Sequence, residues 1–250
     1  MMSEQGARGC ERLIREYSDA GAFEALEAEL PDALLAIDAK QQVLVLTSLA
    51  EAALARGEAR QVIPLCSPLL ENPELSSEAL DVLERLSEAA EDADVLRRTL
   101  ELQVKRAAQP ATRARALERL GDFFDAWQQD TGSATKSWRA AALEFSSEPT
   151  QLGDSRRLYE RVLATAPSDT LSATRLVELC AAAGDWSGAA EAFDALLRSA
   201  PDAEKVASLL VLLEPYANGG DDPEQFVALV DAARWQFGKA LDSNARRLSE

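Results

Sequence analysis

The sequence predicts an all-α protein built from helical hairpins that stack in a row. Among its 250 residues are 46 Ala and 37 Leu but only 15 Val and Ile together. Ala and Leu lose little conformational freedom in a helix, whereas β-branched residues favour strands. Apolar residues recur at three- and four-residue spacing, and turn residues recur about every 34 positions. These three observations together favour repeated helix pairs over a sheet.

The hairpin at 170–201 shows the pattern most clearly. In its first helix, Val177 and Cys180 lie three residues apart, and in its second helix Phe193 and Leu197 lie four apart. That spacing places each pair on one helix face. A Gly184-Asp185 turn separates the two patterns, and Pro201 is expected to end the second helix.

The same turn recurs along the chain. Gly21 and Gly57 are 36 residues apart, and Gly184 and Gly219 are 35 apart. Glu91 stands 34 residues after Gly57, at the position of a third turn, although no glycine is there. We therefore expect hairpins around 21, 57, 91, 184 and 219.

Other segments complete the expected series. Residues 117–142 have the pattern of a further hairpin, but 132–147 and 150–166 both resemble a second helix. Either one of these helices is unpaired or the stretch 132–166 is irregular. The register of residues 31–42 stays open. We expect one domain over 1–250, with 239–250 forming either a capping helix or the start of a further, truncated repeat.

A recurrence of about 34 residues built from helix pairs resembles the tetratricopeptide repeat family. The resemblance depends on small residues at the helix crossings, aromatic residues behind them and prolines after the helices: Ala50, Gly121, Ala134 and Ala189; Phe124, Trp138 and Phe193; Pro73, Pro167 and Pro201. It implies a right-handed α-solenoid of stacked antiparallel helix hairpins, about six in number, plus an irregular helix.

Charge and composition exclude several classes of function. Lys and Arg number 26 against 43 Asp and Glu, giving a net charge of −17. Nucleic acids and anionic membranes need clustered cations, so we expect neither as a partner. There is no histidine, no secretory signal and no apolar run long enough to span a bilayer. Three distant cysteines fit a reducing cytoplasm, with Cys66 and Cys180 in the core and Cys10 exposed.

The sequence offers little that could support catalysis. It has no phosphate-binding glycine loop and no calcium-loop pattern, so we expect no cofactor and no metal. Asp122 and Asp125 could act as a carboxylate pair, but a solvated helix face is the simpler interpretation. Trp138 and Trp186 are expected to pack between helices. For Trp127 and Trp235, packing is favoured over a role as exposed binding anchors.

The family resemblance implies that the first helix of each hairpin lines a concave groove. The residues expected there are Leu44, Thr47, Glu51, Leu54, Asp81, Arg85, Glu88, Arg115, Glu118, Asp122, Asp125, Leu171, Thr174, Glu178 and Ala181. Acids outnumber bases seven to two in this set, which favours a basic or amphipathic partner segment. Seven cations from Arg97 to Arg119 are interpreted as a solvated stripe paired with local acids.

The leading hypothesis is therefore a non-catalytic scaffold that binds another protein or peptide in an acidic groove. The alternative is an N-terminal regulatory or assembly module of a larger enzyme or signalling protein whose activity lies outside this chain. A carboxylate-based enzyme is a third possibility. Self-association through the ends of the solenoid is also expected to be possible.

Overall fold

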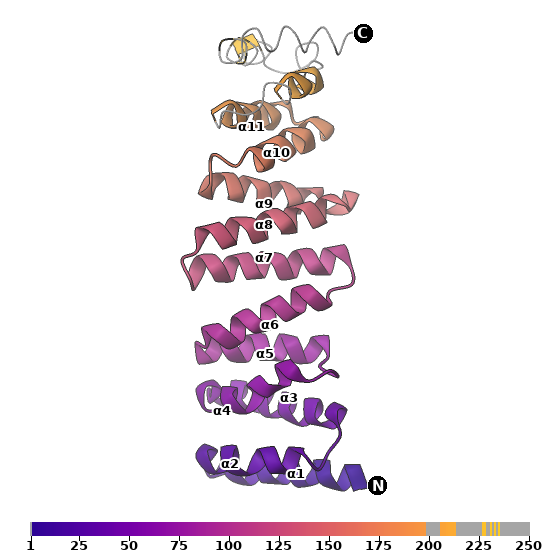
Figure 1. Cartoon of the computed structure of the whole chain (residues 1–250), viewed down its shortest axis with the longest axis vertical. Coiled ribbons are helices and arrows are strands. Elements are labelled where there is room, and N and C mark those ends of the chain that lie inside the picture. The colour runs from indigo at the N-terminus through magenta and orange to yellow at the C-terminus, as the bar shows by residue number, and fades with distance from the viewer. Residues whose placement is uncertain are drawn as a thin grey trace. The chain divides into compact units, whose positions relative to one another are not determined.

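A computed structural model describes residues 2–198 and 206–213 together with positions 227, 228, 231, 233 and 235. All regular secondary structure in these residues is helical, which confirms the predicted class (Figure 1). The chain divides into two compact units, unit 1 at Met1–Ala108 and unit 2 at Gln109–Glu250. Pro201, Gly219 and the expected capping segment 239–250 lie outside the described residues, and the single domain 1–250 stays a prediction.

Unit 1 is a series of helical hairpins joined by short turns. Its elements are α1 (Met2–Asp19), α2 (Phe23–Leu34), α3 (Ala39–Arg56), α4 (Ala59–Cys66), the 3-10 helix η1 (Ser67–Glu71), α5 (Ser77–Ala90) and α6 (Ala93–Arg106). Helix α1 pairs with α2, α3 with α4, and α5 with α6, while α3 also packs against α1 and α5 (Figure 1). Each hairpin therefore covers the apolar face of its neighbour.

The turns of unit 1 follow the sequence pattern, with one exception. Gly21 and Gly57 have φ values of 67° and 74°, the left-handed region where glycine carries no steric cost. Glu91 occupies the corresponding turn with φ 57° although it has a side chain. The Asp92 carboxylate then accepts a hydrogen bond from the Val95 N–H at 3.0 Å and caps α6. The hairpin expected around 91 thus forms without its glycine.

The structure also settles the register of residues 31–42. Helix α2 continues through Pro31 to Leu34, and α3 begins at Ala39. Asp38 caps α3 by accepting a hydrogen bond from the Gln41 N–H at 2.9 Å. The Nε2 atom of Gln42 donates to the Leu34 carbonyl at 3.0 Å, which ties the end of α2 to the start of α3.

Unit 2 contains an additional helix between two hairpins. Its elements are α7 (Pro110–Ala126), α8 (Thr131–Ser146), the 3-10 helix η2 (Pro149–Gln151), α9 (Leu152–Thr165), α10 (Thr170–Ala182) and α11 (Trp186–Arg198). Helix α7 pairs with α8 and α10 with α11, while α9 packs against both α8 and α10. Residues 152–165 therefore form a regular helix that packs on both neighbouring hairpins, so this helix is additional to the hairpins but is not left without a packing partner.

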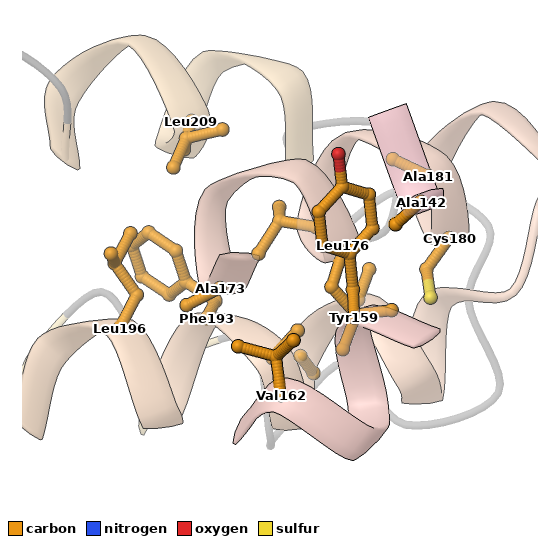
Figure 2. Close-up of a cluster of buried hydrophobic side chains, with 14 of the residues drawn as sticks. Ala142, Tyr159, Val162, Ala173, Leu176, Cys180, Ala181, Phe193, Leu196 and Leu209 are labelled. Carbon is orange, nitrogen blue, oxygen red and sulfur yellow. The ribbon is translucent and has the colours of Figure 1, made fainter. Parts of the chain in front are cut away.

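The core of unit 2 joins three consecutive helices. Tyr159 and Val162 from α9 lie beside Ala173 and Leu176 from α10, with Phe193 from α11 next to them (Figure 2). All five side chains are buried. This continuous packing is what a repeat array needs, because one helix pair cannot cover its own apolar face.

Buried cysteines and tryptophans match the sequence expectations only in part. Cys66 and Cys180 are buried as predicted, and burial raises the pKa of the Cys66 thiol to about 12. The expectation that Cys10 is exposed is wrong, because it is buried and its thiol faces the Ala33 carbonyl of α2 at 3.4 Å.

Two of the four tryptophans pack as expected and two do not. Trp138 is fully buried, and Trp186 packs against the core of unit 2. Trp127 is 39% exposed and Trp235 is 92% exposed, so packing between helices, the favoured interpretation for both, is wrong for Trp235 and incomplete for Trp127.

Helices α7 and α8 approach each other closely at Gly121. A Cβ atom built on Gly121 would lie 2.4 Å from Cδ1 and Nε1 of the buried Trp138 ring. The same indole Nε1 donates a hydrogen bond to Asp122 Oδ1 at 3.0 Å. Only glycine therefore lets the two helices meet over this ring, as the sequence expectation of a small residue at the crossing requires.

We predict that Gly121→Ala lowers the free energy of unfolding of unit 2 by about 1–3 kcal/mol, because the Trp138 ring is enclosed and cannot move aside. All four tryptophans lie in unit 2, so urea denaturation followed by tryptophan fluorescence measures that unit. Gly153→Ala in α9 is the matched control, since nothing lies within 4 Å of its added methyl group. Equal effects of the two substitutions would contradict the close approach.

The unusual turn at Glu91 gives a second prediction. Replacing Glu91 by Gly removes the cost of a side chain at φ 57° and should raise the stability of unit 1 by about 1 kcal/mol. The lost ion pair with Arg60 offsets little of this, because both side chains are largely exposed.

The reciprocal variant Gly57→Ala should destabilise unit 1 by a similar amount, because the φ of 74° is strained for any side chain even where space is open. Urea unfolding followed by far-UV circular dichroism measures both variants. Changes of the same sign in the two variants would show that backbone strain does not decide stability at these turns.

Candidate functional site

A shallow depression lies between α1 and α3, the first helices of two consecutive hairpins in unit 1. It is lined by Ala7, Arg8, Glu11, Gln41, Leu44 and Val45. Leu44, one of the residues expected in the groove, is 61% exposed at this place. Arg8 and Glu11 are also exposed, so the exposed Leu44 side chain lies near charges of both signs. The depression can therefore accept an apolar group together with polar neighbours.

The remaining candidates on α3 have mixed surroundings. Glu51 is exposed, whereas Thr47 and Leu54 are half-buried. Leu54 packs against the core of unit 1, so only part of its side chain is exposed to solvent. The Thr47 hydroxyl oxygen is buried and, within the described part of the chain, accepts or donates no hydrogen bond. The exposed stripe of α3 thus carries Leu44 and Glu51.

The candidates on α5 are all exposed. Asp81 accepts a hydrogen bond from Gln103 Nε2 of α6 at 3.2 Å, and Arg85 Nε donates to the Asp81 carbonyl at 3.4 Å. Glu88 stands one turn beyond Glu84, a buried residue that also accepts from Gln103, at 2.9 Å. Asp81 is therefore turned partly toward the second helix of its own hairpin.

In unit 2, acids expected to line the groove are paired with arginines of α9. Arg157 donates to both carboxylate oxygens of Glu118, at 2.8 and 3.1 Å. Arg161 Nη1 lies 2.5 Å from Asp122 Oδ1. Glu118 and Asp122 follow each other along α7 in the same order as their partners Arg157 and Arg161 along α9. The two helices therefore run parallel. Their ion pairs leave much less unbalanced negative charge on α7 than the sequence alone suggests.

The pair between Asp122 and Arg161 is part of a larger cluster. The Arg161 guanidinium lies 3.8 Å above the centroid of the Trp138 ring, in cation–π contact. Its second nitrogen is 4.0 Å from Asp125 Oδ2, at the limit of an ion pair. One arginine of α9 therefore joins carboxylates of α7 to an indole of α8, and this partnership argues against a catalytic carboxylate pair.

Two of the four candidates on α10 are not available to a partner. Thr174 is 3% exposed and its hydroxyl donates to the Thr170 carbonyl at 2.7 Å. Ala181 is 8% exposed and belongs to the core of unit 2. Their placement on an open groove is therefore corrected: they face inward because α10 is covered on both sides by α9 and α11. Leu171 is exposed, and Glu178 pairs with Arg175 at 2.7 Å.

The cations predicted to form a stripe around residues 97–119 have different partners: some pair with acids, and Arg106 donates to the Leu75 and Asn72 carbonyls. Arg97 contacts Asp94 and Glu101 within its own helix, as the helical spacing predicts. Arg98 and Arg113 instead reach acids of other elements, Glu71 and Glu144. Arg115, the remaining candidate on α7, is exposed. Arg97, Arg98 and Arg113 thus form ion pairs, which agrees in part with the interpretation as a stripe paired with local acids.

Sequence reasoning missed Arg8, Gln41, Arg157 and Arg161. Their residue types and helical positions are visible, but their neighbours lie about 30 to 40 residues away, and only packing brings them together. Among the described residues, no three His, Cys, Asp or Glu side chains gather as metal ligands would. None of the helices described is both long and apolar enough to cross a membrane.

Comparisons with known proteins agree with the repeat pattern. Residues 150–213 match the family model described as "Tetratricopeptide repeat". No curated protein matches the chain.

Among solved structures, chains described as "DHF58 filament", "DHF119 filament" and "DHF38 filament" match at 17%, 16% and 19% identity. The matches cover 98%, 96% and 98% of this chain, and 96%, 98% and 96% of those chains. Each has a TM-score of 0.18, so these likenesses carry no weight in the argument. The family match carries weight instead: a tetratricopeptide-repeat model matches residues 150–213, which contain α9, α10 and α11.

Proposed function

We propose that this chain is a non-catalytic scaffold that binds an amphipathic segment of another protein on the first-helix face of unit 1. We define this face as the exposed side chains of α1, α3 and α5. Tetratricopeptide repeats suggest an interaction role in general, and the repeat match supports that part of the proposal. The choice of the first-helix face as the binding surface depends instead on the side chains that unit 1 exposes there.

The observation that carries the proposal is the position of Leu44. A leucine that is 61% exposed at a depression offers an apolar anchor point, and its neighbours Arg8 and Glu11 can pair with charges on a partner. Binding surfaces commonly place one apolar contact inside a polar rim. An amphipathic segment with one apolar residue directed at Leu44 satisfies both requirements.

Charge favours a partner with basic residues beside that anchor. Residues 1–108 contain 21 acids and 11 bases, and Glu51 and Asp81 are exposed on the first-helix face. In unit 2 the corresponding acids Glu118 and Asp122 are already paired with arginines. The acidic part of the proposed groove is therefore concentrated in unit 1, where it would speed the encounter with a basic segment.

A display library of helical peptides that vary in apolar pattern and charge tests this function. We expect selection on the wild-type chain to enrich basic amphipathic peptides. Those peptides should bind Leu44→Asp roughly tenfold more weakly, the scale of an anchor residue. Glu51→Lys should slow the association of these peptides with the chain, and it should make the association rate less dependent on salt concentration.

Leu35→Asp is the matched control, because Leu35 is an even more exposed leucine of unit 1 that does not line the depression. Fluorescence anisotropy of the selected peptides measures all variants. Equal losses in Leu44→Asp and Leu35→Asp, or enrichment of acidic peptides, would contradict the proposed surface.

A further inference from the structure

A second depression in unit 1 lies between the 3-10 helix η1 and helix α6. It has a volume of about 230 Å³ and is lined by Leu70 and Glu71 of η1 and by Arg98, Glu101, Leu102 and Lys105 of α6. The four residues of α6 stand at positions i, i+3, i+4 and i+7, so they share one face of that helix. None of the lining residues belongs to α1, α3 or α5, and the depression is therefore separate from the first-helix face.

Two leucines give this depression an apolar part. Leu70 is 8% exposed and belongs to the core of unit 1. Leu102 is half-buried and packs against the same core, so part of its side chain remains accessible. An apolar cavity of roughly 150 Å³ holds a group of the size of benzene, whereas pockets for larger ligands begin at about 300 Å³. The depression is therefore of the size for one apolar side chain.

The carboxylates that line the depression already have partners, whereas one cation does not. Glu71 accepts a hydrogen bond from Arg98 at 2.5 Å, and Glu101 accepts one from Arg97 at 2.9 Å. Lys105 is exposed and forms no ion pair with any residue that the structure describes. The uncompensated charge of the lining is therefore the Lys105 ammonium group.

The end of α6 adds to this positive charge. Arg106, the last residue of α6, donates to the Leu75 and Asn72 carbonyls, which carry no full charge to compensate its own. The carboxyl end of a helix carries roughly half a negative charge, which two cations in the last turn exceed. A carboxylate is the group that this local charge attracts, although residues 1–108 are acidic overall.

We propose that the depression between η1 and α6 binds a short segment of a partner protein in which one apolar residue stands next to a single acidic residue. The apolar side chain packs on Leu70 and Leu102, and the carboxylate pairs with Lys105. One carboxylate fits and a run of acids does not, because Glu71 and Glu101 line the same depression and repel further negative charge. This inference rests on the proposed role as a protein-binding scaffold, but its ligand carries little net charge and differs from the basic segment expected on the first-helix face.

Titration of the chain, ¹³C-labelled at its leucine methyl groups, with blocked peptides tests this site by NMR. The first peptide has one leucine beside one glutamate in a glycine-serine background, and two others replace the glutamate by glutamine or the leucine by alanine. We expect a saturable shift of the Leu102 methyl signals, which Leu102→Met identifies by their loss. The glutamine peptide should bind about threefold and the alanine peptide roughly fivefold more weakly. Equal binding of the glutamate and glutamine peptides would overturn the proposal.

Two variants that each remove one positive charge separate this site from general attraction to cations. Lys105→Gln should abolish the preference for the glutamate peptide over the glutamine peptide, whereas Arg15→Gln should keep it. Arg15 is an exposed cation of unit 1 that lies on α1 and does not line the depression. Equal effects of the two variants would overturn the proposal in favour of nonspecific attraction.

Two further titrations identify the kind of ligand and the surface. Hexanoate has a carboxylate and an apolar chain but no peptide backbone, and it should bind more weakly than the glutamate peptide. Equally tight binding of hexanoate at Leu102 would overturn the assignment to a protein partner in favour of a small carboxylate. Leu44→Asp should leave the titration with the glutamate peptide unchanged, so failure of the first-helix face is distinguishable from failure of this site.

Discussion

The close approach of α7 and α8 at Gly121 is the constraint on which the arrangement of unit 2 depends. Because Gly121 has no side chain, the Trp138 ring lies directly against α7, where Asp122 accepts its N–H. The ring then presents its face to Arg161, and this arginine brings α9 onto the same pair of helices. Because the ring is enclosed, a larger residue at 121 would force α7 and α8 apart and strain the contacts that Trp138 makes with Asp122 and Arg161.

Ion pairs that skip one helix recur in unit 2. In each of them, an arginine of one helix pairs with an acid at the second helix before or after it in the chain. Arg157 of α9 pairs with Glu118 of α7, Arg139 of α8 with Asp169 before α10, and Arg156 of α9 with Asp185 before α11. Each bridge joins elements about 30 to 40 residues apart in sequence. These partly exposed pairs contribute little stability singly, but they fix the neighbours of each helix and remove free negative charge from the surface.

Local rules account for the parts of the fold that the sequence predicted correctly. Helix spacing, turn glycines and capping aspartates act within a few residues, so Gly57, Gly184 and Asp92 indicated turns before any contact was known. Glu91 shows the limit of that reasoning, since packing of the hairpin outweighs the cost of its backbone conformation. The burial of Cys10 shows another limit, because its cover comes from α2, twenty-three residues away.

The sequence by itself determined the helical class and the spacing of the hairpin turns, because these follow from side-chain periodicity and from turn residues that act within a few positions. The exposure of Leu44 and Glu51 agrees with the places that the family resemblance implies for them. Only the tertiary structure decided that Thr174 and Ala181 face inward, that Glu118 and Asp122 are paired and that Trp127 remains open. The physical reason is the range of the interactions. Periodicity defines which residues share a face, but which face is covered, and by which opposite charge, depends on how successive helices stack.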